Sequence, residues 1–151
     1  MISIKFLRSD ERKKILQSLK EQYGIEELPF MLIETGKEKI RAFSGSMTKD
    51  EILKLGKLAN IELIGLYMIK QEHDLRLSFD ATHLLKNQIT KSTIEIDDEQ
   101  LDKWMHGNDI EPKEKTEKQT YVISHKGDFL GGGKSNGQIM FNYVPKDRRL
   151  K

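Results

Sequence analysis

The segment GDFLGGGKS (127–135) has the composition of a phosphate-binding loop, because glycines precede a Lys-Ser pair. A loop of that kind needs a glycine five positions before the glycine of Gly-Lys-Ser, and five positions before Gly133 stands Asp128. The residues that follow have a strand pattern, so no helix N-terminus would face a phosphate. We interpret the segment as a strand in which Gly131, Gly132 and Gly133 permit a bulge or a close backbone approach. A tight barrel corner and a nucleic-acid backbone lying against the strand are both compatible with it.

No other part of the sequence has an arrangement for enzymatic chemistry. The chain has no cysteine, which excludes a thiolate zinc site, a disulfide and a cysteine nucleophile. Its four histidines lack metal-motif spacing, and none of its serines lies in a Gly-x-Ser-x-Gly elbow. Asp97, Asp98 and Glu99 are typical of a helix start rather than of an acid–base pair or a metal cluster. The sequence therefore predicts no catalytic residue, no metal and no cofactor, and a protein that is not an enzyme.

The charges are distributed unevenly along the chain. The 151 residues carry a formal net charge of only +2, but residues 1–20 and 111–151 each carry +4 and residues 92–110 carry −5. Such blocks suit either a surface for a polyanion or ordinary solvated helix faces and a loose tail. The C-terminal block includes Lys146, Arg148 and Arg149, and we expect Lys134 to add positive charge beside them. Arginines in this position can contact phosphates through two hydrogen bonds each.

Length and hydropathy limit the class of protein further. A chain of 151 residues forms one ordinary domain or two small ones. The N-terminal residues lack an apolar run of signal-peptide length, and no stretch approaches ~20 consecutive apolar residues. Together with the absence of cysteine, this favours a cytoplasmic protein without a membrane partner.

The first part of the chain predicts a mixed α+β layer, with helices on one side of a largely antiparallel sheet. Thr48 and Glu51 have the spacing of a capping box, and Gly24 can end the first helix. The run at 61–69 is the best candidate for a buried central strand. The expected elements are a helix from Ser9 to Gly24, strands at 29–34 and 39–45, a helix from Thr48, strands at 61–69 and 75–80, and a helical turn capped by Asp80.

The pattern changes near residues 87–92, where we expect a domain boundary. A β-prone segment, an acidic helix ending at Gly107, a charged loop at 111–118 and three short strands follow. Trp104 has the helical spacing of a core residue rather than that of a base-stacking platform. Phe129, Phe141 and Tyr143 alternate with small or polar residues, which predicts that they fill the interior of a small barrel.

This second part resembles the PUA domain, the small RNA-binding pseudo-barrel named for pseudouridine synthases and archaeosine transglycosylases. The resemblance lies in the run MHGNDIEP (105–112) and the glycine strand GDFLGGG (127–133). The chain end VPKDRRLK (144–151) is also similar to C-terminal PUA-like segments of Sun-type rRNA cytosine methyltransferases. The first part is similar in element order to the pre-PUA domain. The resemblance implies an α+β protein with a pre-PUA-like domain at 1–88 and a PUA-like RNA-binding domain at 92–151.

The resemblance also implies where RNA would bind, in a groove beside the glycine that ends the helix and the last strands. From the family pattern it nominates Gly107, Asn108, Gly131, Gly132, Gly133 and Lys134. The charge argument adds Lys146, Arg148 and Arg149.

These observations predict an accessory protein that binds structured RNA in rRNA or tRNA maturation or in ribosome assembly. Its expected partners are rRNA or tRNA and proteins of ribosome assembly or RNA modification. The alternative is a protein–protein adaptor in a ribosome-biogenesis or translation complex, with no direct RNA contact.

Overall fold

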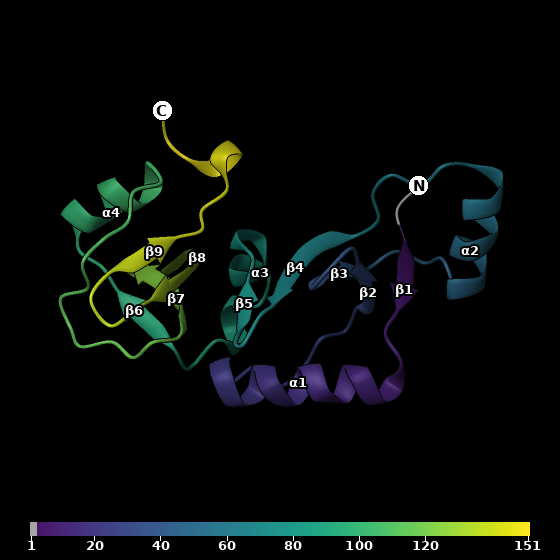
Figure 1. Cartoon of the computed structure of the whole chain (residues 1–151), viewed down its shortest axis with the longest axis horizontal. Coiled ribbons are helices and arrows are strands. Elements are labelled where there is room, and N and C mark those ends of the chain that lie inside the picture. The colour runs from purple at the N-terminus through teal and green to yellow at the C-terminus, as the bar shows by residue number, and fades with distance from the viewer. Residues whose placement is uncertain (1–2) are drawn as a thin grey trace.

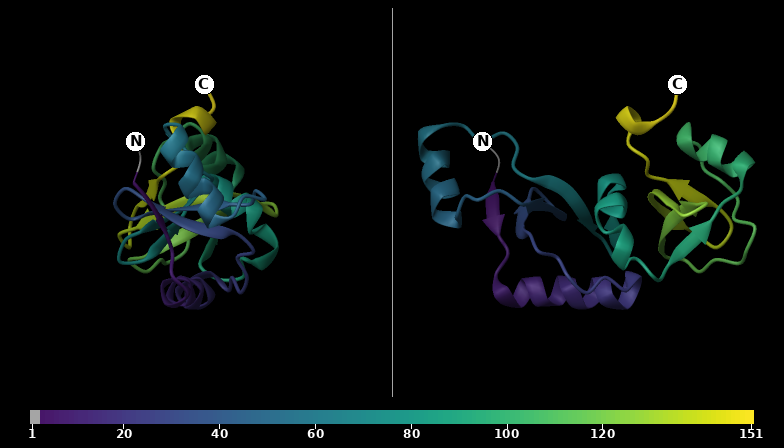
Figure 2. Two further views of the ribbon diagram at one scale, coloured as in Figure 1. Left: turned by 90° about the vertical axis from the view of Figure 1, so that its right-hand side faces the viewer. Right: turned by 180° about the vertical axis from the view of Figure 1, so that it is seen from behind.

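The computed structural model describes residues 3–151 and contains two antiparallel-rich sheets side by side in an elongated molecule (Figure 1). The end-on view in Figure 2 shows the two halves one behind the other along the long axis. In the described residues, helices and strands alternate in a mixed order, which confirms the predicted α+β class. No helix within residues 3–151 is long and apolar enough to span a membrane.

The first sheet has five strands in sequence order, each antiparallel to its neighbour. They are β1 (Ile4–Phe6), β2 (Met31–Thr35), β3 (Lys39–Phe43), β4 (Leu66–Gln71) and β5 (Leu75–Leu77). The helices of this part are α1 (Ser9–Tyr23), α2 (Lys49–Leu58) and α3 (Phe79–Leu84), followed by a 3₁₀ turn at Lys86–Gln88.

Both faces of this sheet carry helices, which corrects the expectation of helices on one side only. Leu32 packs in the cluster that contains Tyr23 of α1 and Ala81 of α3. The next residue, Ile33, points to the opposite face, where it packs with Ile52 of α2. Figure 1 shows α1 lying along the lower side of the sheet.

Most helix ends that were predicted from local sequence signals are confirmed. The Thr48 hydroxyl accepts a hydrogen bond from the Glu51 backbone N–H, and the Glu51 carboxylate accepts one from the Thr48 N–H, so the capping box is confirmed. Gly24 ends α1 in the left-handed conformation, as predicted. Helix α1 begins at Ser9, as expected, with Arg8 as its N-cap residue, and α3 is capped by Ser78 rather than by Asp80.

The long buried strand predicted at 61–69 does not form. The strand begins only at Leu66, because Gly65 has φ +70° and fits against the backbone of Ala42. Arg41 donates from Nε to the Ile64 carbonyl at 2.8 Å and from its second terminal nitrogen to the Gly65 carbonyl at 2.7 Å. The Arg41 side chain thus occupies, by hydrogen bonding, the two carbonyls that a continuous strand would have paired within the sheet.

The second sheet has four strands in sequence order, with β6 parallel to β7 and the others antiparallel. Its elements are β6 (Thr93–Glu95), α4 (Asp98–Met105), β7 (Thr120–His125), β8 (Asp128–Ser135), β9 (Met140–Asn142) and a 3₁₀ turn at Lys146–Arg148. The three strands after the charged loop are confirmed. Trp104 of α4 is fully buried, as predicted, and its indole N–H donates to the Leu130 carbonyl at 2.8 Å.

The two sheets share side-chain packing. Val122 of β7 belongs to the same buried cluster as Tyr23 and Leu77. The hydroxyls of Tyr23 and Thr120 lie 2.9 Å apart. The sheets are therefore held at a defined relative position, although the domain boundary near residues 87–92 stays a prediction.

Candidate nucleic-acid interface

Residues within helix α4 and directly beside it define where the helix begins and ends. The Asp97 carboxylate accepts a hydrogen bond from the Gln100 backbone N–H at 2.8 Å, and the Gln100 side chain accepts one from the Asp97 N–H. At the other end, Gly107 has φ +87°, and its N–H donates to the Trp104 carbonyl at 3.0 Å. A glycine at this position adopts the left-handed conformation at little cost, and it leaves an open surface at the end of the helix.

The C-terminal tail closes over that open surface. Arg149 lies so close to Gly107 that a Cβ built on the glycine would be 2.5 Å from Nε. The same Nε–H donates to the Val144 carbonyl at 2.9 Å, and the Leu150 N–H donates to the Met105 carbonyl at 2.7 Å. The tail is therefore an ordered part of the fold rather than a frayed end.

Asn142, at the end of β9, connects the same helix end to the sheet. Its side-chain amide donates to the carbonyls of Trp104 at 2.8 Å and Asn108 at 3.0 Å. Its backbone N–H donates to the Asp109 carboxylate at 2.8 Å. Sequence reasoning did not single out Asn142, because an asparagine at a strand end has no spacing signal that indicates a partner on a distant helix.

Arg148 reaches across to the first part of the chain. Its guanidinium is 2.8 Å from the Asp80 carboxylate of α3 and lies over the ring of Phe79, 5.9 Å from the centroid. Lys146 is exposed to solvent. The structure thus brings together five of the nine predicted residues, which we call the tail cluster: Gly107, Asn108, Lys146, Arg148 and Arg149.

The three glycines of β8 are not on an open surface, which corrects the expectation that an RNA backbone lies against them. All three are buried. A Cβ on Gly131 would be 2.9 Å from the Phe79 ring, one on Gly132 would be 2.9 Å from the Leu77 carbonyl, and one on Gly133 would be 2.8 Å from the Trp104 ring. The close approach that these glycines permit is with the protein itself.

Lys134 is also separate from the tail cluster. Residues alternate between the two faces of a strand, and the neighbouring Gly133 faces Trp104 on the α4 side. Lys134 therefore points to the other face of β8, together with Phe141, its partner on β9. This placement corrects the expectation that Lys134 lies beside the tail.

Two aromatic residues expected in the barrel interior lie at the surface. Phe141 is 38% exposed and Tyr143 is 39% exposed, whereas Phe129 is half-buried against the first core. The Arg76 guanidinium lies over the Tyr143 ring, 3.7 Å from its centroid. This contact joins the second sheet to strand β5 of the first.

The side chains around α4 include both acidic and basic residues. The hollow along its outer side is lined by more acidic than basic side chains, which does not favour an RNA backbone. The acidic residues there are Asp97, Glu99, Asp109 and Glu111, and the basic residues are Lys103 and Lys113. Hydrogen bonds from His125 and Lys126 hold the pKa of Asp98 below its ordinary value. Within residues 3–151, no group of three or more His, Asp or Glu could hold a metal ion.

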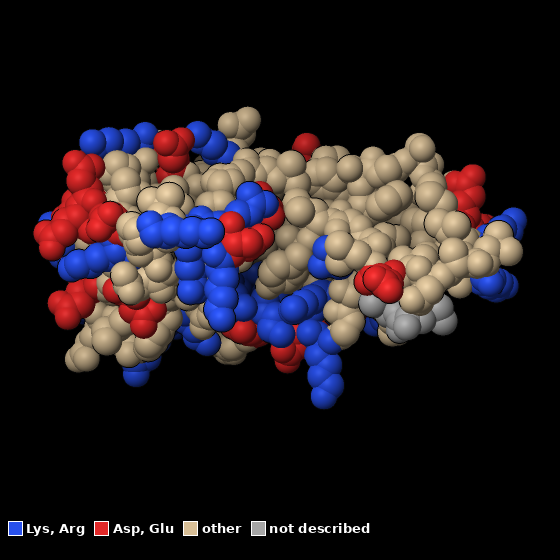
Figure 3. All heavy atoms as spheres, turned by 90° about the horizontal axis from the view of Figure 1, so that it is seen from above, with Lys and Arg blue, Asp and Glu red and all other residues tan. Residues whose placement is uncertain are grey.

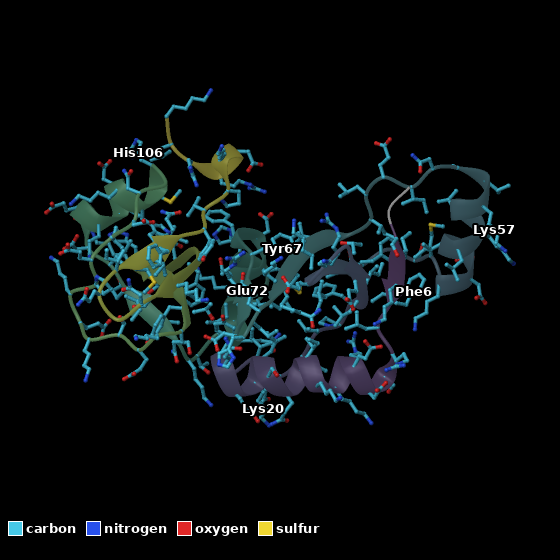
Figure 4. The ribbon with its side chains drawn as sticks, in the orientation of Figure 1. Phe6, Lys20, Lys57, Tyr67, Glu72 and His106 are labelled. Atoms are coloured by element: carbon cyan, nitrogen blue, oxygen red, sulfur yellow. The ribbon has the colours of Figure 1, made fainter. Side chains whose placement is uncertain are left out.

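Lys and Arg side chains gather where the tail crosses the molecule. Figure 3, seen from above, shows them left of centre over the tail and again below centre beside the first sheet, with acidic side chains among them. Figure 4 shows His106 beside the tail at the end of α4, whereas Lys20 lies on the outer side of α1. The basic N-terminal helix therefore does not share the face of the tail.

Comparison with known proteins finds a family model similar to the part that carries the tail cluster. A family model described as the methyltransferase RsmF PUA domain matches residues 91–150. A structure described as a conserved PUA domain protein from Thermoplasma acidophilum is 14% identical, with a TM-score of 0.61 over 97% of each chain. No curated protein matches the chain by sequence.

The two similarities cover different lengths of the chain. The sequence match covers the second sheet, α4 and the tail, and it confirms the resemblance to PUA segments of RNA methyltransferases. The structural match extends over the first sheet as well and concerns the fold. On these grounds residues 91–150 are similar to a methyltransferase PUA domain, and the chain as a whole has the fold of a PUA domain protein.

Proposed function

We propose that this protein binds structured RNA through the tail cluster and performs no chemistry on it. PUA domains are RNA-binding domains, and the family model covers every residue of the tail cluster. The observation that carries the proposal is the packing of the basic tail on the glycine end of α4. It holds the cations at fixed positions, which lowers the entropy lost when phosphates bind.

The members of the tail cluster would have different roles. Lys146 is exposed, and Arg148 keeps 47% of its side-chain surface beside its ion pair with Asp80; both would contact phosphates, releasing counterions. Arg149 holds the tail on Gly107 and adds its charge from a half-buried position. Contacts of this kind read the shape of a helical RNA more than its sequence.

The proposed cellular role is that of an accessory factor in rRNA or tRNA maturation or in ribosome assembly, in the cytoplasm. The matched family model is described as the PUA domain of the methyltransferase RsmF, which supports a role near RNA modification.

The test is RNA binding measured over a range of salt concentrations, with unfractionated tRNA as the probe. Replacing Lys146 and Arg148 by glutamine removes two phosphate contacts, so the slope of log affinity against log salt falls by ~1.4–1.8. The matched control replaces Lys13 and Lys14 of α1, which removes the same charge from the opposite side of the first sheet. Equal loss in both variants, or no binding by the unchanged protein, contradicts the proposal.

The adaptor alternative has one observation in its favour. Helix α2 exposes three leucines, Leu53, Leu55 and Leu58, the last of them 86% exposed. Exposed apolar side chains grouped on one helix are typical of protein contacts. Capture of a protein partner that is lost when Leu55 and Leu58 become serine, with no tRNA binding at low salt, would favour the adaptor.

A further inference from the structure

The first sheet carries a row of three basic side chains directly opposite one another on adjacent strands. Lys39 of β3 pairs in register with Lys70 of β4, and Lys70 pairs with Arg76 of β5. Like charges in directly opposed positions destabilise a sheet. The repulsion within this basic row therefore costs stability in the free protein wherever no acidic side chain or bound anion offsets it.

The basic row lies on the face of the sheet away from α1. The neighbouring row, Ile40, Ile69 and Leu77, is buried in the cluster that contains residues of α1. Each residue of the basic row is a chain neighbour of one of these buried residues. Because successive residues of a strand point to opposite faces, the basic row projects from the side of the sheet opposite α1. Lys39 is exposed, and the side chains of Lys70 and Arg76 keep 21% and 15% of their surface.

Acidic neighbours neutralise the basic row only in part. Lys70 is 3.1 Å from the Glu38 carboxylate, and Arg76 is 3.6 Å from that of Glu72. Among the described residues, Lys39 makes no ion pair within 4.0 Å and instead lies over the Tyr67 ring, 5.5 Å from the centroid. Figure 4 shows Tyr67 and Glu72 in the middle part of the molecule.

The row continues onto the second sheet. Arg76 stacks on Tyr143, and a Cβ on Gly132 would be 3.6 Å from the Arg76 side chain. Lys134 stands two residues after Gly132 on the same face of β8. Cations and partly exposed aromatic rings thus alternate from the first sheet to the PUA domain, a combination that suits a phosphate backbone with bases that stack.

We infer that the basic row is a second RNA contact, so that one RNA spans both sheets, with its backbone over Lys39, Lys70 and Lys134. This inference rests on the proposed RNA binding. It means that the first part of the chain contributes directly to the affinity for RNA. It also makes Lys134, which is not part of the tail cluster, an RNA contact.

Three double variants test it, all measured with unfractionated tRNA over a range of salt concentrations. Lys39→Gln with Lys70→Gln weakens binding about fivefold or more near physiological salt and lowers the salt slope by ~1.4–1.8, as expected for two lost phosphate contacts. Lys13→Gln with Lys14→Gln removes equal charge from α1 and gives a smaller change. Lys146→Gln with Arg148→Gln measures the tail cluster separately.

The outcomes are distinguishable. If the sheet variant matches the α1 control while the tail variant binds more weakly, the second contact is refuted and the proposed function stands. If the unchanged protein does not bind tRNA even at low salt, both fail. Thermal unfolding supplies a second reading, because Lys39→Gln removes a like-charge opposition and is expected to keep or raise the midpoint. A clearly lower midpoint would show that the basic row serves the fold.

Discussion

The guanidinium of Arg149 lies against Gly107, 2.5 Å from the position that a Cβ on the glycine would occupy. The end of a helix and the end of the chain therefore depend on each other. A glycine is needed here for its positive φ, and it is needed again because any side chain would displace the arginine that holds the tail.

Gly107→Ala is expected to destabilise the protein and release the tail. The strained backbone conformation costs about 1–2 kcal/mol, and the clash with Arg149 adds to it. Gly127→Ala is the matched control, since Gly127 has the same φ of +87° but no atom within 4 Å of its Cβ position. Urea unfolding measures the difference, and trypsin cleavage after Arg148 reports the tail. Equal losses in the two variants would show that the Arg149 contact contributes nothing.

Gly132→Val is expected to impair folding before it impairs binding. Its Cβ would be 2.9 Å from the backbone carbonyl of Leu77, which cannot move without separating the two sheets. Overpacking of this kind costs about 1–3 kcal/mol. The fluorescence of Trp104, the only tryptophan, follows unfolding in urea. Gly56→Ala in α2 serves as the control, because its nearest neighbour is at an ordinary 3.5 Å, and unchanged stability of Gly132→Val would contradict the packing.

Tyr23→Phe is expected to loosen the junction between the sheets. The Tyr23 hydroxyl donates to the Leu75 carbonyl and lies 2.9 Å from the Thr120 hydroxyl, so one atom joins α1, β5 and β7. Burial raises the pKa of this hydroxyl, which therefore stays neutral. Loss of the buried hydrogen bonds costs about 1 kcal/mol in urea unfolding. Tyr67→Phe, on the half-buried Tyr67, should cost less, and the reverse order would argue against the junction.

Glu95 is expected to make part of the stability depend on pH. Hydrogen bonds from the Lys126 backbone N–H and the Ser124 hydroxyl, each 2.7 Å long, hold the pKa of Glu95 below its ordinary 4.5. A carboxyl whose pKa is lower in the folded state stabilises the protein above its unfolded value, and this stabilisation is lost as the pH falls through the folded value.

Glu95→Gln is therefore expected to be less stable than the unchanged protein at pH 7, with the difference shrinking toward pH 3. Urea midpoints at several pH values measure it. Glu114→Gln, at an exposed loop position, is the comparison. A difference that stays constant from pH 7 to pH 3 would refute the role of the Glu95 charge.

The sequence by itself determined the features that depend on a few neighbouring residues. Local spacing indicates the capping box at Thr48, the acidic helix start at Asp97, the helix-ending glycines Gly24 and Gly107 and the buried position of Trp104. The backbone preferences and side-chain hydrogen bonds responsible act within one helical turn. For the same reason, the PUA resemblance could be found from short runs of residues.

Only the tertiary structure decided which residues from distant segments of the chain face one another. Strand β1 has three residues, too few for a visible pattern, and forms by pairing with β2. The glycines of β8 are buried because Phe79, Leu77 and Trp104 approach from distant segments. The opposition of Lys39 and Lys70 depends on strand register across a 22-residue connection (44–65) that includes α2. Contacts between segments far apart in the chain are set by the packing of whole layers, so spacing along the sequence does not encode them in readable form.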